Sequence, residues 1–152
     1  MKNLTVRRVT PDEVASSPEF DRLTRQYFDE CGNKAYDGPM PTIDQYRDLH
    51  KSGALHVSGL FDGSALVGFV CVLLVNYMHF SKPCASVESI YLDPAFRATR
   101  GGFMLFEAAR GMAKELGAVG LYLSAPVGSR LERIARAKRW RQTDSVFFID
   151  FE

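Results

Sequence analysis

The hydrophobic positions of the chain alternate at first and then recur at helical spacing, and this change separates the first two predicted elements. Residues 2–9 alternate apolar and polar side chains, which predicts a strand. Apolar residues over 20–31 recur at helical spacing, and a capping-box pattern predicts that this helix begins after Thr10. A second, shorter helix is expected between Thr42 and Gly53.

Strand and helix patterns alternate through the rest of the chain. Predicted strands lie at residues 2–9, 54–61, 65–79, 85–92, 118–124 and 143–151, and predicted helices at residues 11–31, 43–52, 101–116 and 128–138. The dipeptide Asp62-Gly63 between two of these strands is a hairpin-turn signal. The order β-α-α-β-β-β-α-β-α-β predicts one α/β (α+β) domain over residues 1–152. We expect helices on both faces of a central, mixed and mostly antiparallel sheet.

Composition and charge exclude several classes of protein. The chain has 152 residues, of which 46% are hydrophobic and 24% charged, enough for one buried core. The net charge of +1 gives no overall attraction to nucleic acid or to a membrane. The longest apolar run, near residues 65–75, is too short to span a bilayer, and the N-terminus lacks a signal-peptide core. Neither the three cysteines nor the histidines have metal-ligand spacing, so we expect reduced thiols, a cytoplasmic location and no metal.

The segment between the fourth predicted strand and the following helix carries the most informative pattern. After an Asp-Pro pair that ends the strand, a short loop holds Arg97 and Arg100, and Gly101-Gly102 opens the helix. Unpaired N–H groups at a helix start favour an anion, and glycine lets a ligand approach the backbone closely. Together with two arginines, the pattern indicates a phosphate or pyrophosphate site. A helix start that binds nothing is the alternative.

In element order, and most closely from Ser86 to Leu116, the chain resembles the GNAT superfamily of acetyl-CoA-dependent N-acyltransferases. The pyrophosphate loop of that family reads Arg/Gln-x-x-Gly-x-Gly/Ala, and here it runs from Arg97 to Gly102 with Arg100 in place of the first glycine. The resemblance implies a single GNAT-like domain and acetyl-CoA as cosubstrate. The cofactor-binding positions that it implies are Ile90, Tyr91, Leu92, Arg97, Ala98, Thr99, Arg100, Gly101, Gly102 and Phe103. At Ile90 and Leu92 it implies that the backbone pairs with pantetheine and that an N–H polarises the thioester carbonyl.

Acetyl transfer to an amine needs a base for the amine proton and a proton source for the departing thiolate. Glu88, among apolar neighbours in the fourth predicted strand, is the candidate base, and we expect it to be partly buried. An ion-paired or solvent-facing strand carboxylate is the alternative. His79 is a second candidate, with a surface histidine as its alternative. The tyrosine that the family uses as acid is replaced by Ala135, which leaves Tyr122 and Ser124 as candidate acids by proximity.

Charge is distributed unevenly along the chain. Residues 97–141 hold ten Lys and Arg against three Glu, whereas residues 11–52 hold nine Asp and Glu against five Lys and Arg. A polyanionic cofactor suits the first part, and a cationic amine suits the second. We expect the acceptor site between the first two helices and the end of the third strand, and its candidate lining residues are Tyr36, Asp37, Tyr46, Tyr77 and His79.

Three functions remain open at this point. The first is an N-acetyltransferase that acts by direct attack of a primary amine belonging to a small molecule or a protein. The second is a non-catalytic CoA-binding or regulatory module of the same fold, which Arg100 and Ala135 favour. The third is a nucleic-acid-binding domain that uses the basic last helix. Because the last predicted strand, 143–151, is apolar and would form an exposed edge, we also consider a homodimer.

Overall fold

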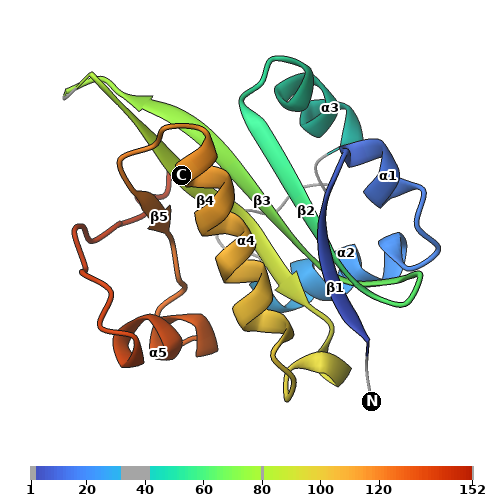
Figure 1. The fold of residues 1–152 in the computed structure, drawn as a ribbon. Helices are drawn as coiled ribbons and strands as arrows, with labels where there is room; N and C mark the ends of the chain where they lie inside the picture. Colours follow the sequence, from blue (N-terminus) through green and yellow to red (C-terminus); the bar gives the residue numbers. More distant parts are fainter. Residues whose placement is uncertain (1–2, 32–41, 80, 152) are drawn as a thin grey trace.

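Five strands form one sheet, and they follow one another in space in the same order as along the chain (Figure 1). The computed structural model describes residues 3–31, 42–79 and 81–151. Its strands are β1 (Leu4–Val9), β2 (Leu55–Asp62), β3 (Ala65–Tyr77), β4 (Lys82–Leu92) and β5 (Leu121–Leu123). Its helices are α1 (Pro11–Ala15), α2 (Phe20–Cys31), α3 (Ile43–Lys51), the 3₁₀ helix η1 (Pro94–Phe96), α4 (Gly101–Glu115) and α5 (Arg130–Ala137).

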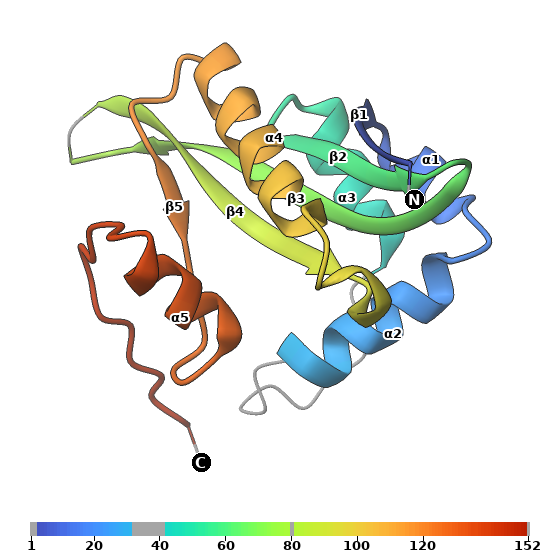
Figure 2. The same cartoon turned by 60° about the horizontal axis from the view of Figure 1, so that its bottom comes forward.

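Helices cover both faces of this sheet, as the sequence predicts. Figure 2 shows α4 on one side of the sheet and α2 and α3 on the other. The core under α4 includes the fully buried Leu60, Val70 and Leu105. The core on the other face includes Leu23 and Leu55, also fully buried. The predicted fold class, a mixed α/β domain with a mostly antiparallel sheet, is confirmed.

The pairing of β5 differs from that of the other strands. Strands β1 to β4 pair antiparallel, whereas β5 pairs parallel to β4. Only Ala85–Val87 of β4 take part, opposite Leu121–Leu123. Beyond Val87, β4 has no strand partner on this side within the part of the chain that the structure describes. The two strands therefore part and leave a gap in the sheet along the second half of β4.

A β-bulge lies at the point where the two strands part. Cys71 of β3 pairs with Ser89 and the next residue, Val72, pairs with Val87, so that Glu88 is the extra residue of β4. An extra residue reverses which backbone groups point toward each neighbouring strand. Before the bulge, the N–H of Ala85 points toward β5 and donates to the Gly120 carbonyl. After it, the odd-numbered residues of β4 point toward β3, as described below for the site.

The first helical region is two helices, and the expectation of one continuous helix is wrong. The predicted capping box is present, since the Glu13 N–H donates to Thr10 Oγ1 and the Thr10 N–H donates to Glu13 Oε2. Pro18 interrupts the helix because it lacks an N–H donor and disfavours a helical conformation at the residue before it. The chain starts again at α2, where the Phe20 N–H donates to the Ser17 carbonyl.

The expected last strand is also wrong, because residues 141–151 form neither helix nor strand. The pattern over 143–151 indicates a strand, but a strand exists only where a neighbour completes its hydrogen bonds. Val146, Phe147 and Phe151 are instead 90%, 85% and 96% exposed.

Among the described helices, none has the length and apolar character needed to cross a membrane. Cys71 and Cys84 are buried free thiols.

Candidate functional site

The gap beside the second half of β4 exposes main-chain groups of the strand. The Asp93 N–H donates to the Val67 carbonyl of β3. Because antiparallel pairing alternates, residues 89, 91 and 93 direct their backbone toward β3, and Ile90 and Leu92 direct theirs toward the gap. The Leu92 carbonyl accepts a hydrogen bond from Arg97 Nε at 3.0 Å. The N–H and C=O of Ile90 and the N–H of Leu92 thus face the gap.

The N-terminus of α4 opens next to the end of β4. The Gly101 N–H donates to Thr99 Oγ1 and the Met104 N–H to the Arg100 carbonyl. The N–H groups of Gly102 and Phe103 have no acceptor among the described residues. A Cβ at Gly102 would meet only Leu92 Cδ2, at 3.8 Å, so this side of the helix start is open. Two oriented N–H donors and an open approach suit an anion.

Arg100 occupies the family's glycine position without backbone strain. Its φ of −74° is accessible to any L-residue, so the exchange of glycine for arginine leaves the loop conformation intact. Its side chain lines a hollow together with Asn3, Leu4 and Met104. Since β1 and β5 are the two opposite edges of the sheet, this hollow lies on the side of α4 that faces away from the gap.

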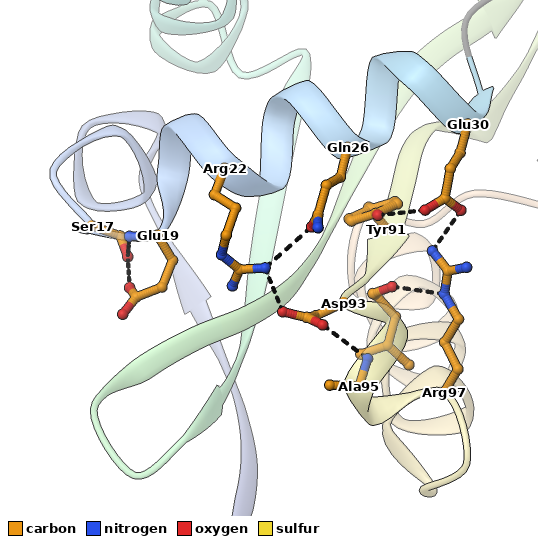
Figure 3. A network of polar contacts seen from close by, with 10 residues as sticks. Ser17, Glu19, Arg22, Gln26, Glu30, Tyr91, Asp93, Ala95 and Arg97 are labelled. Atoms are coloured by element: carbon orange, nitrogen blue, oxygen red, sulfur yellow. Dashed lines mark hydrogen bonds and ion pairs between the residues drawn. The ribbon is translucent and has the colours of Figure 1, made fainter.

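The side chain of Arg97 is engaged inside the protein (Figure 3). Besides Leu92, it bonds Glu30 of α2 at 2.6 Å between Nη2 and Oε2, and its guanidinium lies 5.4 Å from the centre of the Tyr91 ring. Glu30 also accepts the Tyr91 hydroxyl at 2.8 Å. Burial, and then the bond to Glu30, raise the pKa of the Tyr91 phenol. Arg97 therefore holds the end of β4 against α2 and is not free to reach a ligand.

A second ion pair ties α2 to the turn that follows β4. Arg22 Nη1 lies 2.6 Å from Asp93 Oδ2, and the Ala95 N–H donates to Asp93 Oδ1 at 2.9 Å (Figure 3). Burial acts to raise the pKa of the Asp93 carboxyl, but the Ala95 N–H and the Arg22 guanidinium outweigh it and lower that pKa. The two ion pairs, Arg22–Asp93 and Arg97–Glu30, fix the loop before α4 from the side of α2.

Arg130 approaches the same loop from the opposite side of the gap. This first residue of α5 donates from Nη2 to the Arg97 carbonyl at 3.2 Å. Its helix is capped by Ser129, whose side chain accepts the Glu132 N–H. A cation thus bridges the two walls of the gap near the start of α4. Arg130 was not predicted as a site residue, because the sequence shows only that it belongs to a basic segment.

Glu88, the candidate base, projects from the bulge toward α3. The Tyr46 hydroxyl donates to Glu88 Oε1 at 3.1 Å. Burial first, and then the nearby Glu88 carboxylate, raise the pKa of the Tyr46 phenol. Glu88 itself is exposed, so the expected partial burial is wrong. The reason is the bulge, which removes Glu88 from the regular alternation that the sequence pattern assumes.

Three more of the predicted site residues, Tyr77, His79 and Tyr122, form a separate group. The rings of Tyr77 and Tyr122 stack with centroids 6.2 Å apart, and the Tyr77 and His79 rings are also 6.2 Å apart. Tyr77 pairs with Lys82, which lies six residues before Glu88 and hence roughly 20 Å from it along the strand. Tyr122 pairs with Ser86 and is therefore nearer to the bulge. Ser124 is exposed directly after β5, and Tyr36 and Asp37 lie outside the described residues.

Much of the acidity of residues 11–52 is already neutralised by arginines. The ion pairs are Arg7–Glu13, Arg47–Asp12, Arg47–Asp44 and Arg97–Glu30. Acidic side chains that already have a cationic partner attract an incoming amine less than their number suggests. The described residues also contain no group of three or more His, Cys, Asp or Glu that could hold a metal ion.

Known proteins resemble this chain both in sequence and in structure. The sequence model of the acetyltransferase (GNAT) family matches residues 19–136. No curated protein sequence matches the chain. An aminoglycoside acetyltransferase from an uncultured soil metagenomic sample, solved with trehalose, has a TM-score of 0.75 at 16% identity, over 98% of this chain and 97% of its own. A ribosomal-protein-alanine N-acetyltransferase from Brucella melitensis biovar Abortus 2308 gives 0.73 at 19% identity, over 98% and 99%.

A third solved structure carries a ligand related to CoA. It is AAC(6')-Iy with the bisubstrate analogue CoA-S-monomethyl-acetylneamine, with a TM-score of 0.74 at 15% identity, over 99% of both chains. At such low identities these structures demonstrate a common fold and nothing finer. The family match, which spans most of the chain, is the stronger result.

Proposed function

The chain belongs to the GNAT acetyltransferase family, and from that premise we propose that it transfers the acetyl group of acetyl-CoA to a primary amine by direct attack. The acceptor is an amine of a small molecule or of a protein. The observation that carries this proposal is the position of Glu88. It is a carboxylate at the bulge of β4, two residues before the free main-chain edge at Ile90.

Main-chain groups beside the gap and at the start of α4 support acetyl-CoA as the cosubstrate. In our proposal the loop from residue 98 to residue 103 holds the pyrophosphate, chiefly through the N–H groups of Gly102 and Phe103. The backbone of Ile90 and Leu92 pairs with the amides of pantetheine. To these positions we add Arg130, whose guanidinium stands beside the same loop. Arg97 acts indirectly, because its side chain is engaged with Glu30 and Leu92.

The chemistry assigned to these groups is a direct acyl transfer. Acetyl-CoA supplies an activated acetyl group as a thioester. The neutral amine attacks the carbonyl carbon, a C–N bond forms, the C–S bond breaks, and the amine proton passes to Glu88, directly or through water. The N–H of Ile90 or Leu92 polarises the carbonyl oxygen. The thiolate takes a proton from Tyr122, from Ser124 or from water.

A non-catalytic CoA-binding module of the same fold is the second candidate function. The observation in its favour is that Ala135 of α5, at the family's tyrosine position, has no group that can donate a proton. Two solved structures with this fold are named for acetyl transfer to aminoglycosides and to ribosomal protein alanine, which supports the catalytic reading. A cytoplasmic location remains a prediction.

Thermal unfolding with acetyl-CoA, CoA and ATP, followed by an assay of thiol release, tests the proposal. A ligand that binds only the native state at a hundredfold excess over Kd stabilises it by about 2.7 kcal/mol. We expect stabilisation by acetyl-CoA and CoA but not by ATP, and thiol release with a panel of primary amines. The variant Glu88→Gln is expected to lower kcat/KM by about 10²–10⁴-fold and to keep the thermal shift.

The other outcomes separate the two candidate functions. Stabilisation by acetyl-CoA without thiol release from any amine would favour the non-catalytic module. An unchanged kcat/KM in Glu88→Gln would remove Glu88 from the mechanism while leaving the transferase in place. The absence of any shift at millimolar acetyl-CoA would rule out both functions.

A further inference from the structure

A small cavity lies between the sheet and the helices α1 to α3, beside the candidate base. Its volume is ≈ 80 Å³, and its walls include Thr24, Phe28, Ile43, Phe69 and Cys71. Tyr46 of α3 and Ser89 of β4 also line it. Tyr46 also donates its hydroxyl to Glu88, and Ser89 directly follows Glu88, so the cavity adjoins the carboxylate. An amine nitrogen held at Glu88 would therefore have its substituent next to this cavity.

The walls of the cavity select against a second charge. Its lining residues are apolar or aromatic, with neutral hydroxyl and thiol groups between them, and none of those described carries a charge. Asp12 and Asp44, on the same helices, are held by Arg47. An ammonium group placed in such a cavity would lose its hydration without gaining a partner, which costs several kcal/mol. Diamines and polycationic acceptors are thus disfavoured there.

The size of the cavity limits the apolar group that it can take. A protein cavity of about 150 Å³ is known to hold benzene, and one of ≈ 80 Å³ is roughly half as large. A branched group of three or four carbon atoms is a better match than an aromatic ring. Burial of each additional CH₂ group contributes about 0.8 kcal/mol, so a chain that fills the cavity binds appreciably better than one that does not.

We propose that this cavity receives the side group of the acceptor, and that the acceptor is a primary amine on a short, branched alkyl chain. This inference rests on the proposed function, since it names the substrate class of the same site. Tyr46 separates the two parts of the acceptor, because its ring lines the cavity while its hydroxyl meets the carboxylate that takes the amine proton.

A pair of amines with equal carbon counts tests the proposal. Isoamylamine ends in a branched apolar group, whereas cadaverine ends in a second ammonium group. We expect kcat/KM for isoamylamine to exceed that for cadaverine by roughly 100-fold, the cost of a buried unpaired charge. Equal values, or a preference for cadaverine, would overturn the proposal while leaving the transferase intact.

A variant within the cavity wall supplies the second test. Thr24→Leu fills part of the cavity with a larger side chain, and Leu is a better helix former than Thr, so α2 is kept. We expect it to lower kcat/KM for isoamylamine about 10-fold. Arg25→Leu, an exposed neighbour outside the cavity, is the matched control and should leave that value unchanged. Equal effects of the two variants would count against the cavity.

Binding can be followed separately from transfer. With CoA present, isoamylamine should shift the NMR signals of the Ser89 and Thr24 amides. Such shifts without acetyl transfer would support the cavity and contradict the proposed function. If isoamylamine shifts no signal from the cavity wall at 100 mM, the inference is wrong whatever the activity.

Discussion

The Tyr46 hydroxyl donates a hydrogen bond of 3.1 Å to Glu88, and this bond joins α3 to the bulge of β4. Glu88 is exposed, so without such a donor its carboxylate would be free to change rotamer. A base works only when it is held within hydrogen-bond reach of the proton that it removes. Tyr46 is thus a positioning residue for Glu88 in the proposed reaction.

Replacing Tyr46 by phenylalanine removes this bond and keeps the ring. We expect Tyr46→Phe to lower kcat about 10-fold and to leave the affinity for acetyl-CoA unchanged, because orientation of the base is lost while the cofactor contacts remain. Steady-state kinetics with acetyl-CoA varied will measure both. The double variant with Glu88→Gln should be no slower than Glu88→Gln alone, since both changes disable the same group. Additive losses would mean that Tyr46 acts elsewhere.

Gly101 and Gly102 should respond in opposite ways to the same substitution. A Cβ at Gly101 would lie 2.9 Å from Cδ2 of the fully buried Leu60, whereas one at Gly102 would meet only Leu92, at 3.8 Å. We expect Gly101→Ala to lower the free energy of unfolding by about 1–2 kcal/mol through overpacking. Gly102→Ala should raise it by up to about 1 kcal/mol through helix propensity. Urea unfolding of the two variants will decide, and a reversed order would contradict the packing described at Leu60.

Arg97 and Arg100 should differ in their contribution to stability. Arg97 bonds the Leu92 carbonyl and Glu30, while Arg100 makes no ion pair with the described residues. We expect Arg97→Met to lower the free energy of unfolding by about 1–3 kcal/mol, because two partners lose a charged donor. Arg100→Met should stay within about 0.5 kcal/mol of wild type. Chemical denaturation at fixed salt is the measurement, and equal values would show that Arg97 does not brace the loop.

The Arg22–Asp93 pair makes stability depend on pH. Since the pKa of Asp93 is lower in the folded protein than its ordinary value of 3.8, the pair contributes fully above that value. The contribution is lost as pH falls through the lower, folded pKa. We expect the free energy of unfolding to drop between pH 5 and pH 2.5, and the drop to be smaller in Asp93→Asn. Equal pH dependence in both proteins would exclude Asp93 as its source.

Local signals in the sequence were sufficient where neighbouring residues decide the structure. The capping box at Thr10 and the turn at Gly63, with φ of 62°, are set by residues close in the chain, and both are present. The break at Pro18 was missed although proline is a local signal, because the apolar spacing on either side suggested one helix. The apolar pattern over 143–151 indicated a strand, but a pattern cannot provide the strand's partner.

Long-range contacts account for most of what the sequence did not reveal. Arg97 looked like a ligand for phosphate, yet its partner Glu30 lies 67 residues away and cannot be seen from the loop. The bulge at Glu88 is a property of the register between β3 and β4, which no single strand pattern contains. The same register places Tyr77 of β3 roughly 20 Å from Glu88 of β4, so residues on two paired strands did not share a site.

Strand β5 pairs with β4 through only three residue pairs in the described sheet, which makes its attachment to the sheet weaker than that of the other strands. The chain from β5 onward is attached to the sheet through this short strand pairing. Additional contacts are the Tyr77–Tyr122 ring stack, the Arg130 hydrogen bond and the contact between the rings of Phe106 and Trp140. Regions with few ties open at lower free energy than the core. A ligand bound in the gap beside the second half of β4 would add contacts between β4 and the chain from β5 onward. Ligand binding in the gap and the stability of the chain from β5 onward are thus coupled.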